Sequence, residues 1–217
     1  MTVARYDGLA DWYDEHLGDF AARGTAVLAE LMRGGRGSCL EVGCGGGWQL
    51  AALVAAGRTV VGVDISVDQL RIAQKRLGDH ARLVLGDAIR LPFRPEAFDI
   101  VVSAFTHTDF DDWAAALSEC VRVLRPGGRL MYVGTHPCFV GPFPRYPEGG
   151  APVLYPGYRN TAWTTDGPGM GNGLRRRVGV RHVPLAKLLN TFIDAGLRLE
   201  EPGPEDFPKT LVVVEQQ

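Results

Sequence analysis

The stretch Leu40-Glu41-Val42-Gly43-Cys44-Gly45-Gly46-Gly47-Trp48 decides the fold. Its apolar start predicts a strand, and its glycines predict a tight turn into a helix. Gly43 permits the turn, and Gly45 allows a ligand to approach the backbone closely. Because glycine-rich turns occur in many α/β domains, a purely structural turn remains an alternative. Asp64 ends the next strand, about 20 residues later, where dinucleotide-type folds place an acid that binds ribose.

Strands alternate with helices on both sides of this stretch. Apolar and β-branched runs predict strands at residues 39–42, 59–63, 81–85, 98–103 and 129–133. Helical spacing of apolar residues predicts helices at residues 50–56, 70–77 and 113–124. We expect Asp109 or Asp111 to cap the third helix and Pro126-Gly127-Gly128 to end it. This alternation predicts βαβ units, right-handed crossovers and a mainly parallel sheet.

The two ends of the chain extend this pattern. Two helices, at residues 9–17 and 20–31, are separated by Gly18 and form a predicted N-terminal helical cover over residues 1–35. A helix at residues 185–195 stops at Gly196. Strand-like runs at residues 197–199 and 211–214 follow it.

Residues 137–181 differ from the rest of the chain. They hold half of all prolines and six arginines, against one glutamate and one aspartate. A structureless stretch of this length in a compact domain is a functional lid or binding loop, or else disordered. Its aromatic and arginine side chains suit a planar or anionic small molecule, the alternative being a solvated loop. We therefore expect an acceptor-binding lid inserted after the fifth strand.

Length and composition indicate one globular domain over residues 1–217. The 217 residues are 46% hydrophobic and 22% charged, which excludes a disordered or fibrous chain. A net charge of −2 gives no sign of nucleic acid or of an anionic membrane as partner. We see no apolar run long enough to span a bilayer, no signal peptide, and no cysteine spacing typical of a metal site or disulfide framework. The expectation is a cytoplasmic protein without metal.

A nicotinamide cofactor fits the glycine loop poorly. Gly43 and Gly45 match the first two glycines of the nicotinamide fingerprint, whereas Trp48 stands at the third position. That third glycine allows close packing of helix on strand, and a Trp would displace the helix. This departure argues against a nicotinamide-dependent oxidoreductase.

Five segments in order resemble the motifs of class I S-adenosylmethionine-dependent methyltransferases. They are LEVGCGGG at 40–47, VGVDIS at 61–66, GDAIRLPF at 86–93, FDIVVSAF at 98–105 and VLRPGGRLMYVG at 123–134. The resemblance spans roughly residues 5–135. It implies a Rossmann-like, doubly wound, mainly parallel sheet of seven strands whose last strand is antiparallel. It also implies S-adenosylmethionine as cofactor.

The resemblance assigns cofactor contacts to matching residues, moiety by moiety. Those for the methionine and ribose parts are Glu41, Gly43, Cys44, Gly45, Asp64 and Ser103. Those for adenine are Ile65, Gln69, Asp87 and Ala88. Two aromatic residues, Tyr6 and Tyr13, resemble those that close over the cofactor, with core packing as the alternative. Asp99 is expected to be structural.

Two histidines follow strands at the edge where open α/β sheets bind ligands. His107 comes after the fourth strand and His136 after the fifth. Because histidine can act as a base near neutral pH, both are candidate catalytic residues. Each could instead hydrogen-bond a loop. A further histidine, His182, is expected to be structural.

The sequence thus favours a methyltransferase that acts on a small molecule. The favoured acceptor atom is oxygen, with nitrogen next and carbon third. An alternative is a protein of this fold that binds the cofactor without transferring a methyl group. The expected partner is a small-molecule acceptor, anionic or aromatic, and the protein would be a monomer or a homodimer.

Overall fold

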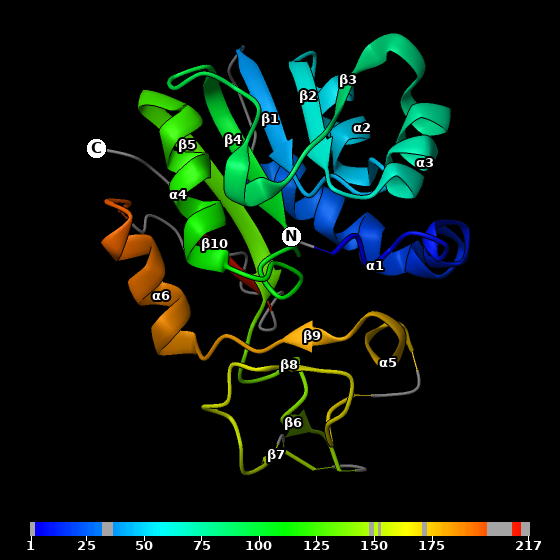
Figure 1. Cartoon of the computed structure of the whole chain (residues 1–217), viewed down its shortest axis with the longest axis vertical. Helices are drawn as coiled ribbons and strands as arrows, with labels where there is room; N and C mark the ends of the chain where they lie inside the picture. Colours follow the sequence, from blue (N-terminus) through cyan, green and yellow to red (C-terminus); the bar gives the residue numbers. More distant parts are fainter. Residues whose placement is uncertain are drawn as a thin grey trace.

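The computed structural model describes residues 3–31, 37–147, 150–151, 153–170, 173–198 and 210–213. Its centre is a six-stranded sheet with the strand order β10-β5-β4-β1-β2-β3 (Figure 1). The strands are β1 (Ser38–Val42), β2 (Thr59–Asp64), β3 (Arg82–Leu85), β4 (Phe98–Ala104), β5 (Leu124–Thr135) and β10 (Thr210–Val213). The first five are parallel, and β10 runs antiparallel to β5. The predicted parallel α/β sheet is thereby confirmed.

A seven-stranded layout is only partly visible. The predicted strand at residues 197–199 lies partly outside the described residues, because Leu199 is not among them. The predicted run at residues 211–214 matches β10, except that Val214 lies outside the described residues.

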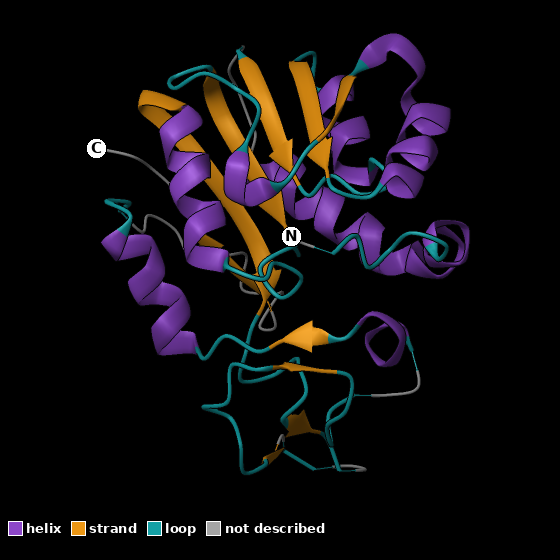
Figure 2. Cartoon of the chain, in the orientation of Figure 1, coloured by secondary structure: helices purple, strands orange, loops and turns teal. Residues whose placement is uncertain are grey.

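Helices cover both faces of the sheet (Figure 2). Helices α4 (Trp113–Val123) and α6 (Leu185–Asp194) pack on one face, around the buried side chains of Leu117, Tyr132 and Phe192. Helices α1 (Ala10–Leu31), α2 (Trp48–Ala55) and α3 (Val67–Leu77) lie on the other face. Short 3-10 turns follow α3 at Gly78–His80 and precede β4 at Ala88–Arg90.

Three local expectations are wrong. Helix α1 is continuous through Gly18, because one glycine costs a helix only about 1 kcal/mol and the helix packs against α2 and α3. Asp112 caps α4, and its carboxylate accepts a hydrogen bond from the amide of Ala115. Helix α4 ends at Val123 and strand β5 begins at Leu124, so Pro126-Gly127-Gly128 forms an irregularity within the strand instead of ending the helix.

The lid, residues 137–181, is not structureless. It contains the paired strands β6 (Pro144–Arg145) and β7 (Val153–Leu154), the strand β8 (Trp163–Thr164) and helix α5 (Leu174–Val178). Strand β8 pairs with β9 (Val180–Arg181). Figure 1 shows these elements beyond the carboxyl ends of the parallel strands. The lid therefore stands at the edge where the ligand site is expected.

Asp99 ties the start of β4 to the start of β1. Its carboxylate accepts hydrogen bonds from the backbone amide of Ser38 at 2.7 Å and from the Ser38 hydroxyl at 2.9 Å. It also forms an ion pair with Arg125. Arg125 and then the Ser38 amide hold the pKa of this carboxyl below its usual range. These contacts fit the structural role expected for Asp99.

We expect Asp99→Ala to lower the free energy of unfolding by about 1–2 kcal/mol at pH 7, because hydrogen bonds to a partly exposed carboxylate are lost. A carboxyl whose pKa is lowered by folding stabilises the protein above its unfolded-state pKa of about 4, and this contribution fades as the pH falls through the folded-state pKa. Urea unfolding should therefore show a smaller difference between variant and wild type at pH 3. The exposed Asp79→Ala serves as control, and an equal difference at both pH values would contradict the assignment.

Candidate active site

One cavity lies at the carboxyl ends of β1, β2 and β4. It encloses about 1040 Å³, part of it open to solvent. Ten of the twelve predicted cofactor residues line it: Tyr6, Tyr13, Gly43, Cys44, Gly45, Asp64, Ile65, Gln69, Asp87 and Ala88. The strand order reverses between β1 and β4, and open α/β sheets bind ligands at such a point.

The glycine loop is fixed to the end of β2 by its backbone. The amides of Gly43 and Cys44 both donate to the carbonyl of Val63, at 2.8 and 3.1 Å. Gly43 has a φ of 72°, and a Cβ there would lie 2.5 Å from Cγ2 of Thr106. The loop after β4 thus packs directly against the glycine turn, which only glycine permits.

Asp64 connects the loop to β2 from the cavity side. Its Oδ2 accepts a hydrogen bond from the Gly45 amide at 2.8 Å, and its Oδ1 accepts one from the Ser66 amide at 2.9 Å. Burial raises the pKa of this carboxyl, and the two amides counteract the rise. A carboxylate has about four acceptor sites, so Asp64 retains capacity for a ribose hydroxyl.

Two buried polar groups near the loop have unused hydrogen-bonding capacity. Glu41 is 1% exposed, and its Oε2 has no hydrogen-bond partner among the described residues. Gln69 is 2% exposed and lines the cavity, and its Nε2 likewise has no partner there. Burial, and next the charge of Asp64, raises the pKa of Glu41. Unpaired buried polar atoms are costly, so both fit contacts with a polar ligand or its bound water.

Ser103 and the two candidate histidines lie away from this cavity. Ser103 is buried, and its hydroxyl shares a 2.5 Å hydrogen bond with that of Thr106, which does line the cavity. His107 is buried beside Tyr132, with 2.6 Å between its Nδ1 and the phenol oxygen. His136 is partly buried, and its Nδ1 accepts from the Cys138 amide at 3.2 Å. The described residues that line the cavity include no histidine.

Burial, and next the charges of Arg175 and His182, lowers the pKa of His107 to about 3. His182 is buried against Phe143 and Tyr158, and burial lowers its pKa to about 4. Both side chains are therefore neutral near pH 7. His107 packs against Tyr132 of the sheet, and His182 packs against two residues of the lid. Both contacts are typical of structural residues.

A network of side chains that the sequence did not predict supports the glycine loop. The indole of Trp48 donates to Asp14 at 2.9 Å, and the guanidinium of Arg76 binds the same carboxylate at 2.8 and 2.9 Å. Arg76 also donates to the carbonyl of Gly46 and lies 4.1 Å from the ring centroid of Trp48. These residues come from three helices, so no local motif could reveal the network.

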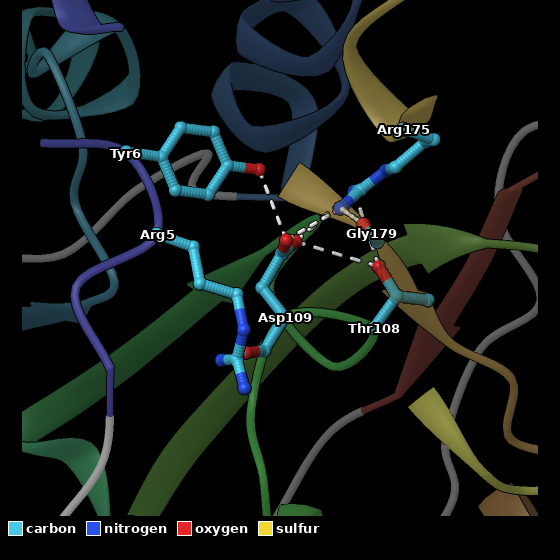
Figure 3. Close-up of polar contacts among 6 residues, drawn as sticks. All are labelled: Arg5, Tyr6, Thr108, Asp109, Arg175 and Gly179. Carbon is cyan, nitrogen blue, oxygen red and sulfur yellow. Dashed lines mark hydrogen bonds and ion pairs between the residues drawn. The ribbon is translucent and has the colours of Figure 1, made fainter. Parts of the chain in front are cut away.

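A further part of the cavity wall is not predicted by the sequence. It consists of the N-terminal segment with Val3 and Arg5 and the loop after β4 with Phe105, Asp109 and Phe110. Figure 3 shows the Tyr6 hydroxyl pointing to Asp109, to which it donates at 2.9 Å. The rings of Tyr6 and Tyr13 lie 5.1 Å apart. No described residue of the lid lines the cavity.

Comparisons with known proteins agree with this geometry. A family model described as methyltransferase domain matches residues 40–132. The matched residues are similar to the methyltransferase domain of class I S-adenosylmethionine-dependent methyltransferases. S-adenosylmethionine is the methyl donor of this family, and the carboxylate, glycine turn and unpaired polar atoms fit it.

Individual relatives extend the comparison. The chain is 35% identical over 114 residues to demethylmenaquinone methyltransferase of Staphylococcus saprophyticus, covering 50% of this chain and 49% of that protein. The chain therefore spans about half the length of the curated relatives that it matches. An S-adenosylmethionine-dependent methyltransferase from Mesorhizobium loti has the same fold, with a TM-score of 0.75, 22% identity and coverage of 92% of this chain and 99% of that one. The 4+2 cyclase SpnF also shares the fold, with a TM-score of 0.59, 24% identity and coverage of 82% and 58%.

No metal or membrane element is evident in the described part of the chain. Its His, Cys, Asp and Glu side chains form no cluster that could hold a metal ion. None of its helices is long and apolar enough to cross a membrane.

We expect Asp64→Ala to weaken binding of S-adenosylmethionine by about 1.5–3 kcal/mol, the usual value of hydrogen bonds to a charged group. The variant also releases the Gly45 amide, so the loop should loosen while the sheet stays folded. Titration calorimetry measures the affinity, and circular dichroism checks the fold. The exposed Asp79→Ala is the control, and unchanged affinity in Asp64→Ala would exclude the ribose contact.

A second prediction concerns the contact between Gly43 and Thr106. Gly43→Ala should destabilise the protein by about 1–3 kcal/mol, because it combines a positive φ with a clash against the Thr106 methyl group. Thr106→Ser removes that methyl and keeps the hydroxyl, so it should restore part of the loss. Gly57→Ala gives the cost of a positive φ alone, since its Cβ would meet nothing within 4 Å. Chemical denaturation of the four variants measures the coupling, and additive effects would contradict the contact.

Proposed function

We propose that this protein transfers a methyl group from S-adenosylmethionine to a small-molecule acceptor. The observation that carries the proposal is the mixed lining of this cavity. Asp64, Gln69 and the glycine loop line it and suit the donor. The aromatic rings of Tyr6 and Phe110 and the N-terminal segment also line it and suit an acceptor, so we assign them to an acceptor side.

The protein's contribution to such a reaction is alignment. The sulfonium of S-adenosylmethionine supplies an already activated methyl group, so the enzyme mainly brings the acceptor into line and excludes water. The polar groups on the acceptor side are mostly paired with one another. Arg5 binds Asp111 at 2.5 Å, and Asp109 is bound by Arg175 and Tyr6. That side therefore offers shape and aromatic surface more than free charge.

We further propose a planar aromatic acceptor methylated at oxygen or carbon. Phe105, Phe110 and Tyr6 give the cavity flat apolar surfaces, which stack with planar rings. The curated relatives are named for demethylmenaquinone, a quinone, and this supports carbon beside oxygen as the methylated atom. Oxygen alone is therefore not the favoured atom.

A histidine base has little geometric support. A general base must come within hydrogen-bond reach of the proton that it removes, and neither His107 nor His136 lines the cavity. A base role for His136, at the end of β5, stays a prediction. An acceptor that is already an anion, such as a phenolate or an enolate, would need no base.

The lid is proposed to control the acceptor side indirectly. It contacts the N-terminal segment through the Arg5 guanidinium, which lies 3.7 Å from the ring centroid of Trp163, and through Arg177 over Trp12. It contacts the loop after β4 through Arg175. Movement of the lid would therefore change the position of the cavity wall.

A second candidate function is binding of the cofactor without methyl transfer. The fold shared with a 4+2 cyclase shows that this architecture alone does not prescribe methyl transfer. The proposed function predicts that the purified chain binds S-adenosylmethionine and converts it to S-adenosylhomocysteine only when a suitable acceptor is present.

The test incubates the protein with S-adenosylmethionine carrying a labelled methyl group and a panel of hydroquinones, phenols and aromatic acids. Mass spectrometry then detects a labelled product, and Asp64→Ala is the inactive control. Label in a hydroquinone or phenol would support the proposal and identify the methylated atom. Tight cofactor binding without label in any acceptor of the panel would favour the non-transferring alternative.

A further inference from the structure

Three segments far apart in the sequence meet at Asp109. Figure 3 shows Tyr6 from the N-terminal segment, Asp109 from the loop after β4, and Arg175 from helix α5 of the lid. The guanidinium of Arg175 binds both carboxylate oxygens of Asp109, with 3.0 Å between Nη2 and Oδ2. Arg175 is further fixed by the Thr108 hydroxyl at 3.2 Å and the Gly179 carbonyl at 3.4 Å.

The carboxylate of Asp109 has no free capacity. It accepts from the Tyr6 hydroxyl at 2.9 Å, twice from Arg175, and from the Thr108 hydroxyl at 3.4 Å. A carboxylate offers about four acceptor sites, so all are used. Its side chain is 18% exposed, and that of Arg175 is 31% exposed. Asp109 is therefore an anchor within the wall and is unsuited to be the base of the reaction.

The consequence falls on Tyr6, which lines the cavity. A phenol has one proton, and that of Tyr6 is donated to Asp109. The phenol oxygen can then only accept hydrogen bonds from a ligand. Donation to an ionised carboxylate also makes that oxygen more negative, because linked hydrogen bonds polarise one another. The wall thus presents a negatively polarised oxygen while the carboxylate behind it is neutralised by Arg175.

We propose that Arg175 and Asp109 form a latch that fixes the Tyr6 hydroxyl as an acceptor, and that Tyr6 thereby favours the positively charged methyl donor over its neutral product. S-adenosylmethionine carries a sulfonium with positively polarised hydrogens, whereas S-adenosylhomocysteine carries an uncharged thioether. A fixed acceptor oxygen in a cavity of low dielectric distinguishes these two charges. Tyr6 is then a specificity-determining residue, and Asp109 and Arg175 are positioning residues that act through it. The inference rests on the proposed function, since both ligands belong to that reaction.

The same latch gives the lid a route to the cavity. No described lid residue lines the cavity, but Arg175 reaches Tyr6 through one carboxylate. The backbone supports this link, because the Arg181 amide donates to the Thr108 carbonyl at 2.8 Å. A lid that has moved away would release Asp109, and with it the orientation of the Tyr6 proton.

The experiment measures the dissociation constants of S-adenosylmethionine and S-adenosylhomocysteine by titration calorimetry on the full chain. Tyr6→Phe removes the acceptor oxygen and keeps the ring. The double variant Asp109→Asn/Arg175→Gln removes the latch without changing the net charge of the wall. The matched control is Asp166→Asn/Arg176→Gln, which removes the neighbouring lid ion pair, in which the side chains are 79% and 42% exposed.

We expect Tyr6→Phe and the latch variant each to reduce the preference for S-adenosylmethionine over S-adenosylhomocysteine by about tenfold, the value of one hydrogen bond to a charged group. Combining Tyr6→Phe with the latch variant gives a triple variant. It should lose no more of this preference than either variant alone, because both changes remove the same interaction. The control pair should keep the wild-type preference. If these residues were purely structural, the variants would bind both ligands more weakly to the same degree, and the preference would stay unchanged.

An unchanged preference in Tyr6→Phe overturns the proposal, as does a latch variant that behaves like the control pair. Additive losses in the triple variant would overturn the claim that Arg175 acts through Tyr6. A wild-type chain that binds neither ligand would instead overturn the proposed function, so the two failures are distinguishable. Because Tyr6→Phe is a conservative change, the test holds even if the latch variant folds poorly.

Discussion

The carbonyl at the end of β2 is the constraint on which the site depends. The Val63 carbonyl accepts the amides of both Gly43 and Cys44, and this pins the glycine turn to the neighbouring strand. Asp64, the next residue, then receives the Gly45 amide. The carboxylate proposed to bind ribose and the glycine loop are thus set by consecutive residues of one strand. Any shift of β2 relative to β1 would move both together.

Because the turn is fixed in this way, the rest of the wall must fit around it. Thr106 packs so closely on Gly43 that a single methyl group would clash. The hydroxyl of Thr106 is held in turn by Ser103 within β4. These contacts hold the start of the loop after β4, which carries Asp109 and Phe110 to the cavity. The glycine turn and this part of the cavity wall are connected through Thr106.

Local patterns predict the parallel sheet and the glycine loop with Asp64, because strand, glycine turn and strand-end acid are encoded within about 25 consecutive residues. The cavity wall around Tyr6 depends on pairs that local patterns cannot reveal. Tyr6 and Asp109 are 103 residues apart, and Asp109 and Arg175 are 66 apart. Gly18 does not divide helix α1, because packing against α2 and α3 outweighs the propensity of one residue. The position of His107 after a strand suggests a base, whereas burial decides its protonation.

Trp48 departs from the nicotinamide fingerprint and has a structural role of its own. In the nicotinamide fingerprint a glycine at this position allows the helix to pack closely on the strand. Here the indole instead joins Asp14 of α1 and Arg76 of α3 in a network that also holds the Gly46 carbonyl. The N-terminal helix is thereby bound to the glycine loop, and the segment before it brings Arg5 and Tyr6 to the cavity. The residue that argues against a nicotinamide cofactor thus helps to position the part of the cavity wall that contains Arg5 and Tyr6.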